Sequence, residues 1–142
     1  MKSNKLVIEY EYDFTVLAIA SSSKEFKLAW AINKSLQIKL AKQPDISFEF
    51  LKGSRFLISN FLFESEYSSF RLLKNKAVEF ENVSKPFLLP ELKYCDYLLR
   101  LEGEFSEEYL QHIMLKIKEL NIIQHVEVLN VSNINSKENL LF

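Results

Sequence analysis

Two carboxylates lie five residues apart in the segment Leu89–Tyr97, and paired carboxylates are side chains that enzymes use for acid–base chemistry. We expect Glu91 in a connector and Asp96 at the start of a strand, on the face opposite Tyr97. Pro90 favours an extended entry to that strand, where both carboxylates can accept backbone hydrogen bonds. The pattern favours a structural role or partner recognition over catalysis, because no histidine or metal cluster accompanies the pair.

Histidine, cysteine and glycine are too sparse for the usual reactive or cofactor sites. His112 and His125 form no metal-binding motif, and Cys95, the single cysteine, permits neither an intramolecular disulfide nor a common zinc spacing. Gly53 and Gly103 stand far apart, so no glycine-rich phosphate loop exists, and we expect each at a turn. The sequence therefore predicts no catalytic residue, no metal site and no cofactor.

A basic cluster interleaved with phenylalanine is the strongest sign of nucleic-acid binding. Its residues are Lys52, Arg55, Arg71, Lys74 and Lys76. A sheet that exposes basic and aromatic side chains can bind single-stranded RNA. The net charge of −1 lacks the basic excess typical of such proteins, and no DNA-reading motif is present.

The last residues form a polar stretch with an apolar end. Residues 132–142 close on Leu140, Leu141 and Phe142. An apolar end of this kind either folds back on its own domain or inserts into another protein. Both alternatives remain open, and deletion of residues 137–142 would separate them.

Length and composition favour one soluble domain over residues 1–142. Of its 142 residues 48% are hydrophobic, enough for a core without a disulfide or metal. Glu9, Glu11 and Asp13 interrupt any signal-peptide core, and no apolar run reaches the length of a membrane span. We expect a cytoplasmic protein without membrane contact.

The elements that must position these residues follow from hydrophobic periodicity. We expect strands over 6–12 and 14–20, the second buried on both faces. Ser22 and Glu25 fit a capping box for a helix that buries Phe26, Ala29, Trp30 and Ile32 and ends near Ser35. A short strand over 36–40 follows, and Pro44 ends that element.

The remaining elements read as a meander followed by a β-α-β unit. Strands over 47–52, 55–64 and 68–80 are expected, with a turn at Lys52-Gly53-Ser54 and a break at Asn75. A strand over 94–102 places Cys95 and Tyr97 on one face. Ser106 then caps a helix, and a strand over 122–131 returns parallel to the first. The fold class is α+β, an antiparallel or mixed sheet with two helices on one face, ferredoxin-like in part.

The segment Leu89-Pro90-Glu91, three residues, then Cys95-Asp96-Tyr97 resembles the signature of the IPExxxVDY family. Leu89 and Cys95 replace the Ile and Val of that signature. The runs IEYEYDF (8–14), KLAWAIN (27–33) and SKENLLF (136–142) also look like family features, so the resemblance covers nearly the whole chain. It implies a small bacterial protein of unknown function.

Three functions follow in order of preference. The first is a non-catalytic protein-interaction or accessory domain that uses the region Pro90–Tyr97, with another protein or a second copy as its partner. The second is an accessory factor that binds single-stranded RNA through the basic cluster. The third is a regulatory domain that binds a small molecule. We do not expect an enzyme.

Overall fold

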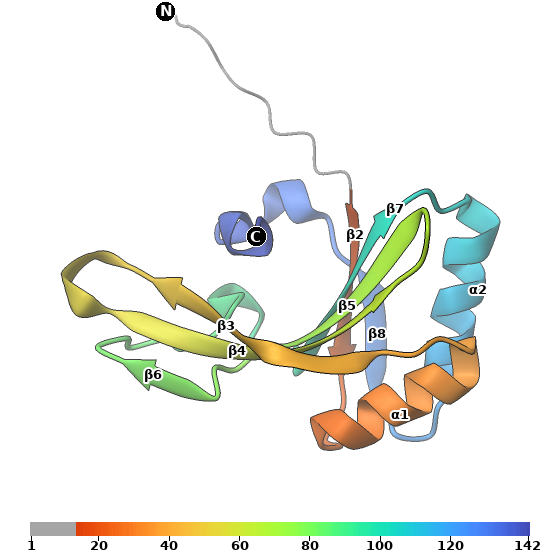
Figure 1. The fold of residues 1–142 in the computed structure, drawn as a ribbon, viewed down its shortest axis with the longest axis horizontal. Helices are drawn as coiled ribbons and strands as arrows, with labels where there is room; N and C mark the ends of the chain where they lie inside the picture. The colour runs from red at the N-terminus through yellow and green to blue at the C-terminus, as the bar shows by residue number, and fades with distance from the viewer. Residues whose placement is uncertain (1–13) are drawn as a thin grey trace, which may run out of the picture.

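The computed structural model describes residues 14–142, so the strand expected over 6–12 lies outside the described residues. In the described part, a seven-stranded sheet carries two α-helices (Figure 1). The elements are β2 (Phe14–Ala20), α1 (Glu25–Leu36), β3 (Ala41–Glu49), β4 (Arg55–Glu64), β5 (Ser68–Lys74), β6 (Glu79–Glu81), β7 (Tyr97–Gly103), α2 (Glu107–Lys118) and β8 (His125–Val128). The α+β class is confirmed. Across residues 14–142, neither helix could cross a membrane.

The strands follow the order β3-β4-β5-β7-β2-β8, and β6 pairs with the first residues of β4, Arg55 to Leu57. Each pairing is antiparallel. The strands β7 and β8 are therefore parallel, as expected, but β2 lies between them. This split β-α-β arrangement gives β5, β7, β2 and β8, with their two helices, a ferredoxin-like connectivity. The hairpin of β3 and β4 is inserted between α1 and β5 and extends to one side of the molecule (Figure 1).

The sheet is covered on both faces, which explains the unbroken apolar run of β2. Leu17 and Ile19 face the helices and belong to the core cluster that contains the buried side chains of α1 and α2. Val16 and Ala18 face the other way, into a second cluster closed by the connector before β7 and by the C-terminal residues. A central strand buried on both sides needs apolar side chains at every position.

Helix α2 forms as expected. The Ser106 hydroxyl oxygen accepts a hydrogen bond from the Tyr109 backbone N–H at 3.1 Å and caps the helix. Ile113 and Ile117 are fully buried against the sheet, four residues apart on one helix face.

Helix α1 begins differently from the expectation. Its N-cap residue is Lys24, and no side chain of the described residues caps it. The expected capping box is wrong because its two members have tertiary partners instead. The Ser22 backbone N–H donates to Gln124, and the Glu25 carboxylate accepts from the Ser59 hydroxyl at 2.8 Å.

The buried face of α1 also differs from the expectation. Leu28, Ala29 and Ile32 are buried, whereas Phe26 and Trp30 are 62% and 63% exposed. The aliphatic side chains satisfy the helical spacing, so the two aromatic residues point outward. Prediction of their burial was wrong, and the helix presents large apolar groups on its outer surface.

Two expectations about β3 and its entry are wrong. No strand covers 36–40, because α1 extends to Leu36 and Gln37 ends it with a left-handed backbone, φ 56°. Pro44 lies inside β3 at a break in register between Gln43 and Ile46. An edge strand tolerates proline at such a bulge, because the missing N–H is not required for pairing.

Some expectations about the elements after β3 are confirmed and others are wrong. The turn between β3 and β4 and the break at Asn75 are confirmed. Strand β7 begins at Tyr97, after a turn at Lys93–Tyr94, and Cys95 packs on the face opposite Tyr97. Their expected common face is therefore wrong. The last strand, β8, is much shorter than the expected 122–131.

Candidate functional site

The segment Pro90–Tyr97 holds three other parts of the chain together. The Asp96 carboxylate accepts a hydrogen bond from the Ser21 backbone N–H at 2.8 Å. The Tyr97 hydroxyl donates to the Ser23 carbonyl oxygen at 2.6 Å. These two contacts fix the loop that joins β2 to α1. Burial, then the charges of Glu25 and Asp96, raise the pKa of Tyr97 to about 12, so its hydroxyl remains a donor.

Glu91 binds the C-terminal region rather than Asp96. Its carboxylate accepts hydrogen bonds from the Ser136 hydroxyl and from the Ser136 backbone N–H, the second at 3.1 Å. Burial acts to raise the pKa of Glu91, but hydrogen bonds from the Ser136 side chain and from the backbone of Glu91, Ser136 and Asn135 together outweigh it, and the pKa is lowered. The two carboxylates therefore serve separate contacts and do not form an acid–base pair.

Asn75 is the buried centre of this region. Its side-chain amide donates to the Leu92 and Cys95 carbonyl oxygens at 3.0 and 2.9 Å, and its side-chain oxygen accepts from the Leu89 backbone N–H at 2.8 Å. The residue is fully buried. The strand expected over 68–80 breaks at Asn75, because the Asn75 side chain supplies hydrogen bonds to backbone groups of the connector that would otherwise lack them.

A pocket of about 300 Å³ opens beside the loop that Asp96 and Tyr97 hold. Its wall includes Ser21, Ser22 and Ser23. Four lysines from three segments also line it: Lys24, Lys74, Lys76 and Lys93. We call this the basic pocket. A pocket with convergent polar groups is the usual form of a ligand site.

The charge of the basic pocket is strongly positive. Asp96 is the one carboxylate among its described lining residues, and its Oδ2 atom already accepts from the Ser21 backbone N–H. The N-terminus of α1 lies at the pocket, where Lys24 is the N-cap and, within residues 14–142, no side chain caps the backbone N–H groups. Lysine ammonium groups and a helix N-terminus both favour an anion, above all a phosphate group.

The C-terminal residues fold back on the sheet. Leu140 is completely buried, and the Arg100 guanidinium donates to its carbonyl oxygen at 2.7 Å. The Phe142 ring lies over the guanidinium groups of Arg100 and Arg71, at 4.1 and 5.4 Å. Burial lowers the pKa of both arginines, although Glu102 acts to raise it.

The predicted RNA-binding residues do not share one surface. Lys74 and Lys76 line the basic pocket, but Arg71 lies half-buried beneath Phe142. Arg55 forms ion pairs with Glu79 and Glu81. Lys52 sits in the turn between β3 and β4.

The nucleophilic and imidazole side chains lie in separate environments. Burial raises the pKa of the Cys95 thiol to about 12, so it is not a thiolate at neutral pH. His125 pairs with Glu127 at 3.4 Å, and both are substantially exposed. Ring stacking places His112 beside Tyr109 on α2. The described residues contain no group of three or more His, Cys, Asp or Glu side chains suited to a metal ion.

Asp96, Tyr97, Lys74 and Lys76 are candidate residues from the sequence, and the structure brings them together at the basic pocket. Ser21, Ser23 and Lys93 also line the pocket, but the sequence pattern does not identify them as part of a site. The one available signal is Ser22 before a helix, and the sequence pattern favours a helix cap for it.

Comparisons of the chain with protein-family models, with curated proteins and with solved structures find no match. The resemblance to the IPExxxVDY family therefore remains a prediction.

Proposed function

We propose that this chain is a non-catalytic accessory domain that binds a phosphate-bearing small molecule in the basic pocket. The observation that carries the proposal is the convergence of four lysines from three segments on a pocket whose described lining includes one carboxylate. Burial of part of a ligand there would strengthen each ammonium–phosphate contact, because such contacts gain strength away from bulk water.

The arrangement around the pocket supports binding rather than reaction. The Asp96 Oδ2 atom and the Tyr97 hydroxyl are engaged in holding the loop that forms the pocket wall. The serine side chain of Ser21 donates to the Ile122 carbonyl oxygen at 2.7 Å, so its hydroxyl is also engaged. We assign these residues to shaping the pocket and the lysines to contacting the ligand.

Nuclear magnetic resonance of the full chain tests the proposal. Inorganic phosphate, pyrophosphate and 5′-AMP are added separately, and the backbone amide shifts of Ser21–Lys24 are followed. We expect saturable shifts there, and affinity at least about tenfold weaker in the double variant Lys74→Gln/Lys76→Gln, because each lost charged contact is worth about 1.5–3 kcal/mol. Lys52→Gln, at the β3–β4 turn, is the matched control and should bind like the natural chain.

Single-stranded RNA is the second candidate, since two residues of the predicted RNA-binding set line the same pocket. A ten-nucleotide RNA serves as the probe for it. RNA binding much tighter than 5′-AMP binding, and lost in Lys74→Gln/Lys76→Gln, would replace the small-molecule proposal. Absence of shifts at Ser21–Lys24 with all four probes at low salt would refute both.

A further inference from the structure

Six carboxylates gather at one end of the sheet, where the β4–β5 loop meets the start of α2. They are Glu64, Glu66, Glu102, Glu104, Glu107 and Glu108, and all are exposed. The two loops touch, because the Glu104 backbone N–H donates to the Tyr67 carbonyl oxygen at 3.3 Å. Within residues 14–142 none of these six carboxylates forms an ion pair. We call this surface the acidic end.

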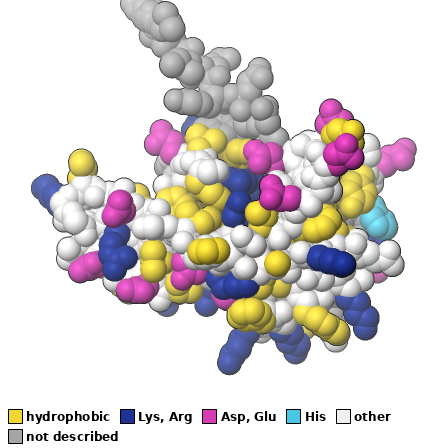
Figure 2. Space-filling view, in the orientation of Figure 1, with side chains coloured by type: hydrophobic (Ala, Val, Ile, Leu, Met, Phe, Trp, Pro, Cys, Tyr) yellow, Lys and Arg dark blue, Asp and Glu magenta, His cyan; other side chains and the backbone are white. Residues whose placement is uncertain are grey.

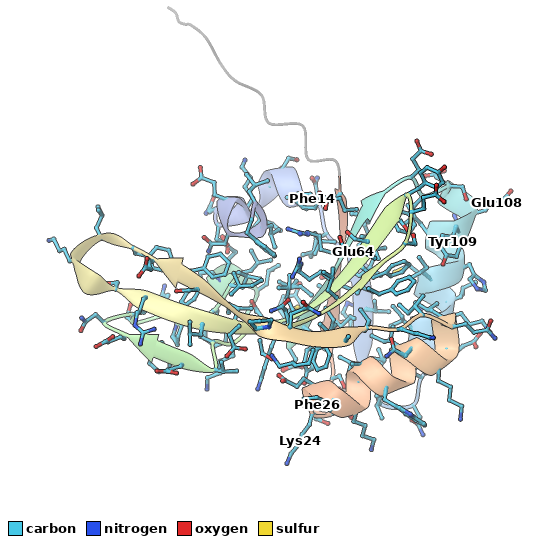
Figure 3. The ribbon with its side chains drawn as sticks, in the orientation of Figure 1. Phe14, Lys24, Phe26, Glu64, Glu108 and Tyr109 are labelled. Carbon is cyan, nitrogen blue, oxygen red and sulfur yellow. The ribbon has the colours of Figure 1, made fainter. Side chains whose placement is uncertain are left out.

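The lysines around the basic pocket lie at the opposite end of the same strands. Ser68 pairs with Gly103 at the acidic end of β5 and β7, and Lys74 pairs with Tyr97 at the other. Figure 2 shows acidic side chains at the upper right and basic ones along the lower edge. In Figure 3, Glu108 and Lys24 mark these two regions. The net charge of −1 is therefore the sum of negative and positive charges that lie largely at opposite ends of the sheet.

The outer face of α1 adds exposed aromatic groups to the basic end. Phe26 and Trp30 lie one helical turn apart, each more than half exposed. Lys27 and Lys34 are exposed beside them, and the Lys34 ammonium lies 5.1 Å from the centre of the Trp30 ring. We call these four residues the α1 face. Exposed aromatic side chains ringed by charge are typical of protein-binding surfaces.

We propose that the α1 face of one copy docks on the acidic end of a second copy. Charge complementarity supports this occupant, because the chain itself carries an exposed cluster of carboxylates opposite in sign to Lys27 and Lys34. The acidic end also exposes Tyr67 and Tyr109, by 70% and 38%, which gives Phe26 and Trp30 aromatic contacts. Two different surfaces meet in such a contact, so the association is head-to-tail and can continue beyond a dimer.

The oligomeric state of the full chain tests this proposal. We expect the mass in sedimentation equilibrium to rise above 16.7 kDa with concentration in about 20 mM salt. The rise should disappear in about 500 mM salt, where charges are screened within a few ångströms. Trp30, the single tryptophan, should shift its emission to shorter wavelength as the association proceeds.

Two charge-reversal variants make the test specific. Lys27→Glu/Lys34→Glu reverses the charge of the α1 face, and Glu66→Lys/Glu104→Lys removes most of the negative charge of the acidic end at loop positions. Each variant alone should associate far more weakly than the natural chain, because its two surfaces repel in the first variant and have lost most of their attraction in the second. An equimolar mixture should form a complex of the two, while Lys52→Glu should associate like the natural chain. Circular dichroism checks that each variant is folded.

Three results would overturn the proposal. The first is a natural chain that stays monomeric at about 200 µM in low salt, since contacts between opposite charges are strongest in low salt. Association that persists in both reversal variants would place the contact elsewhere. Failure of the folded variants to combine would show that the α1 face and the acidic end do not meet, even if either binds another protein. None of these results bears on phosphate binding, which uses other lysines.

Discussion

Asn75 shows how much of this fold depends on one buried polar side chain. It satisfies three backbone groups of the connector before β7, and these groups have no strand partner there. Asparagine is suited to this position because its side chain both donates and accepts. The connector in turn carries Asp96 and Tyr97, which fix the wall of the basic pocket.

Replacement of Asn75 by alanine should lower the free energy of unfolding by about 3 kcal/mol or more, because buried backbone groups are left without partners. Asn139→Ala is the matched control. That side chain donates to one carbonyl oxygen, of Leu88, at 2.8 Å in a half-buried position, so a loss of about 1 kcal/mol is expected. Urea unfolding measures both. Equal losses would show that the Asn75 contacts are not the centre of the connector.

Glu91 and Asp96 illustrate what the sequence could and could not establish at this scale. Both accept backbone N–H groups, which is what the structural interpretation of the segment expects. Their partners, Ser21 and Ser136, are far from them in sequence, so no local pattern could identify them. For the same reason the basic pocket could not be predicted, since Lys24, Lys74 and Lys93 are far apart in sequence and meet only in the folded chain.

Among the elements, strand β7 ends at Gly103, where its backbone lies against the backbone of the β4–β5 loop. Gly103 has φ +115°, and a Cβ atom built there would lie 2.2 Å from the Tyr67 carbonyl oxygen. The strand therefore requires glycine for two reasons, its backbone conformation and the contact with the β4–β5 loop. Gly53 also has a positive φ of +73°, but a Cβ atom there would make only an ordinary contact, 4.0 Å from the Asn82 side-chain nitrogen.

Gly103→Ala should therefore destabilise the chain by roughly 3 kcal/mol or more, because two backbone segments must separate. Gly53→Ala has the strain of a left-handed backbone alone, about 1 kcal/mol. Thermal unfolding followed by circular dichroism compares the two variants. If the two midpoints fall equally, the close contact between β7 and the β4–β5 loop does not contribute to stability.

Periodicity located most elements correctly and misassigned the face of α1. The helix carries two apolar stripes on roughly opposite sides, one with Phe26 and Trp30 and one with Leu28 and Ile32. Helical spacing alone cannot rank them. Packing decided, because the aliphatic stripe fits between the sheet and α2 and the aromatic stripe remains outside. Pro44 is a similar case, since its place on an edge strand depends on strand order.

On the scale of the whole molecule, the sheet has a helical face and a face closed by irregular chain. The second face contains Val131, Ile134 and Leu140 from the C-terminal residues. Three polar contacts hold these residues in place, namely Ser136 with Glu91, Asn139 with the Leu88 carbonyl oxygen, and Arg100 with the Leu140 carbonyl oxygen. The C-terminal residues thus complete a core that the strands alone would leave open.

Leu140→Ala should lower the free energy of unfolding by about 3 kcal/mol, because the side chain is completely buried and its removal leaves a cavity. Leu141→Ala provides the matched control, since Leu141 is 42% exposed and the expected loss is below about 1 kcal/mol. Deletion of residues 137–142 should destabilise at least as much as Leu140→Ala. Urea unfolding of the three chains gives the comparison. Unchanged stability on deletion would mean that these residues do not complete the core, and their apolar side chains would then be better explained by docking into another protein.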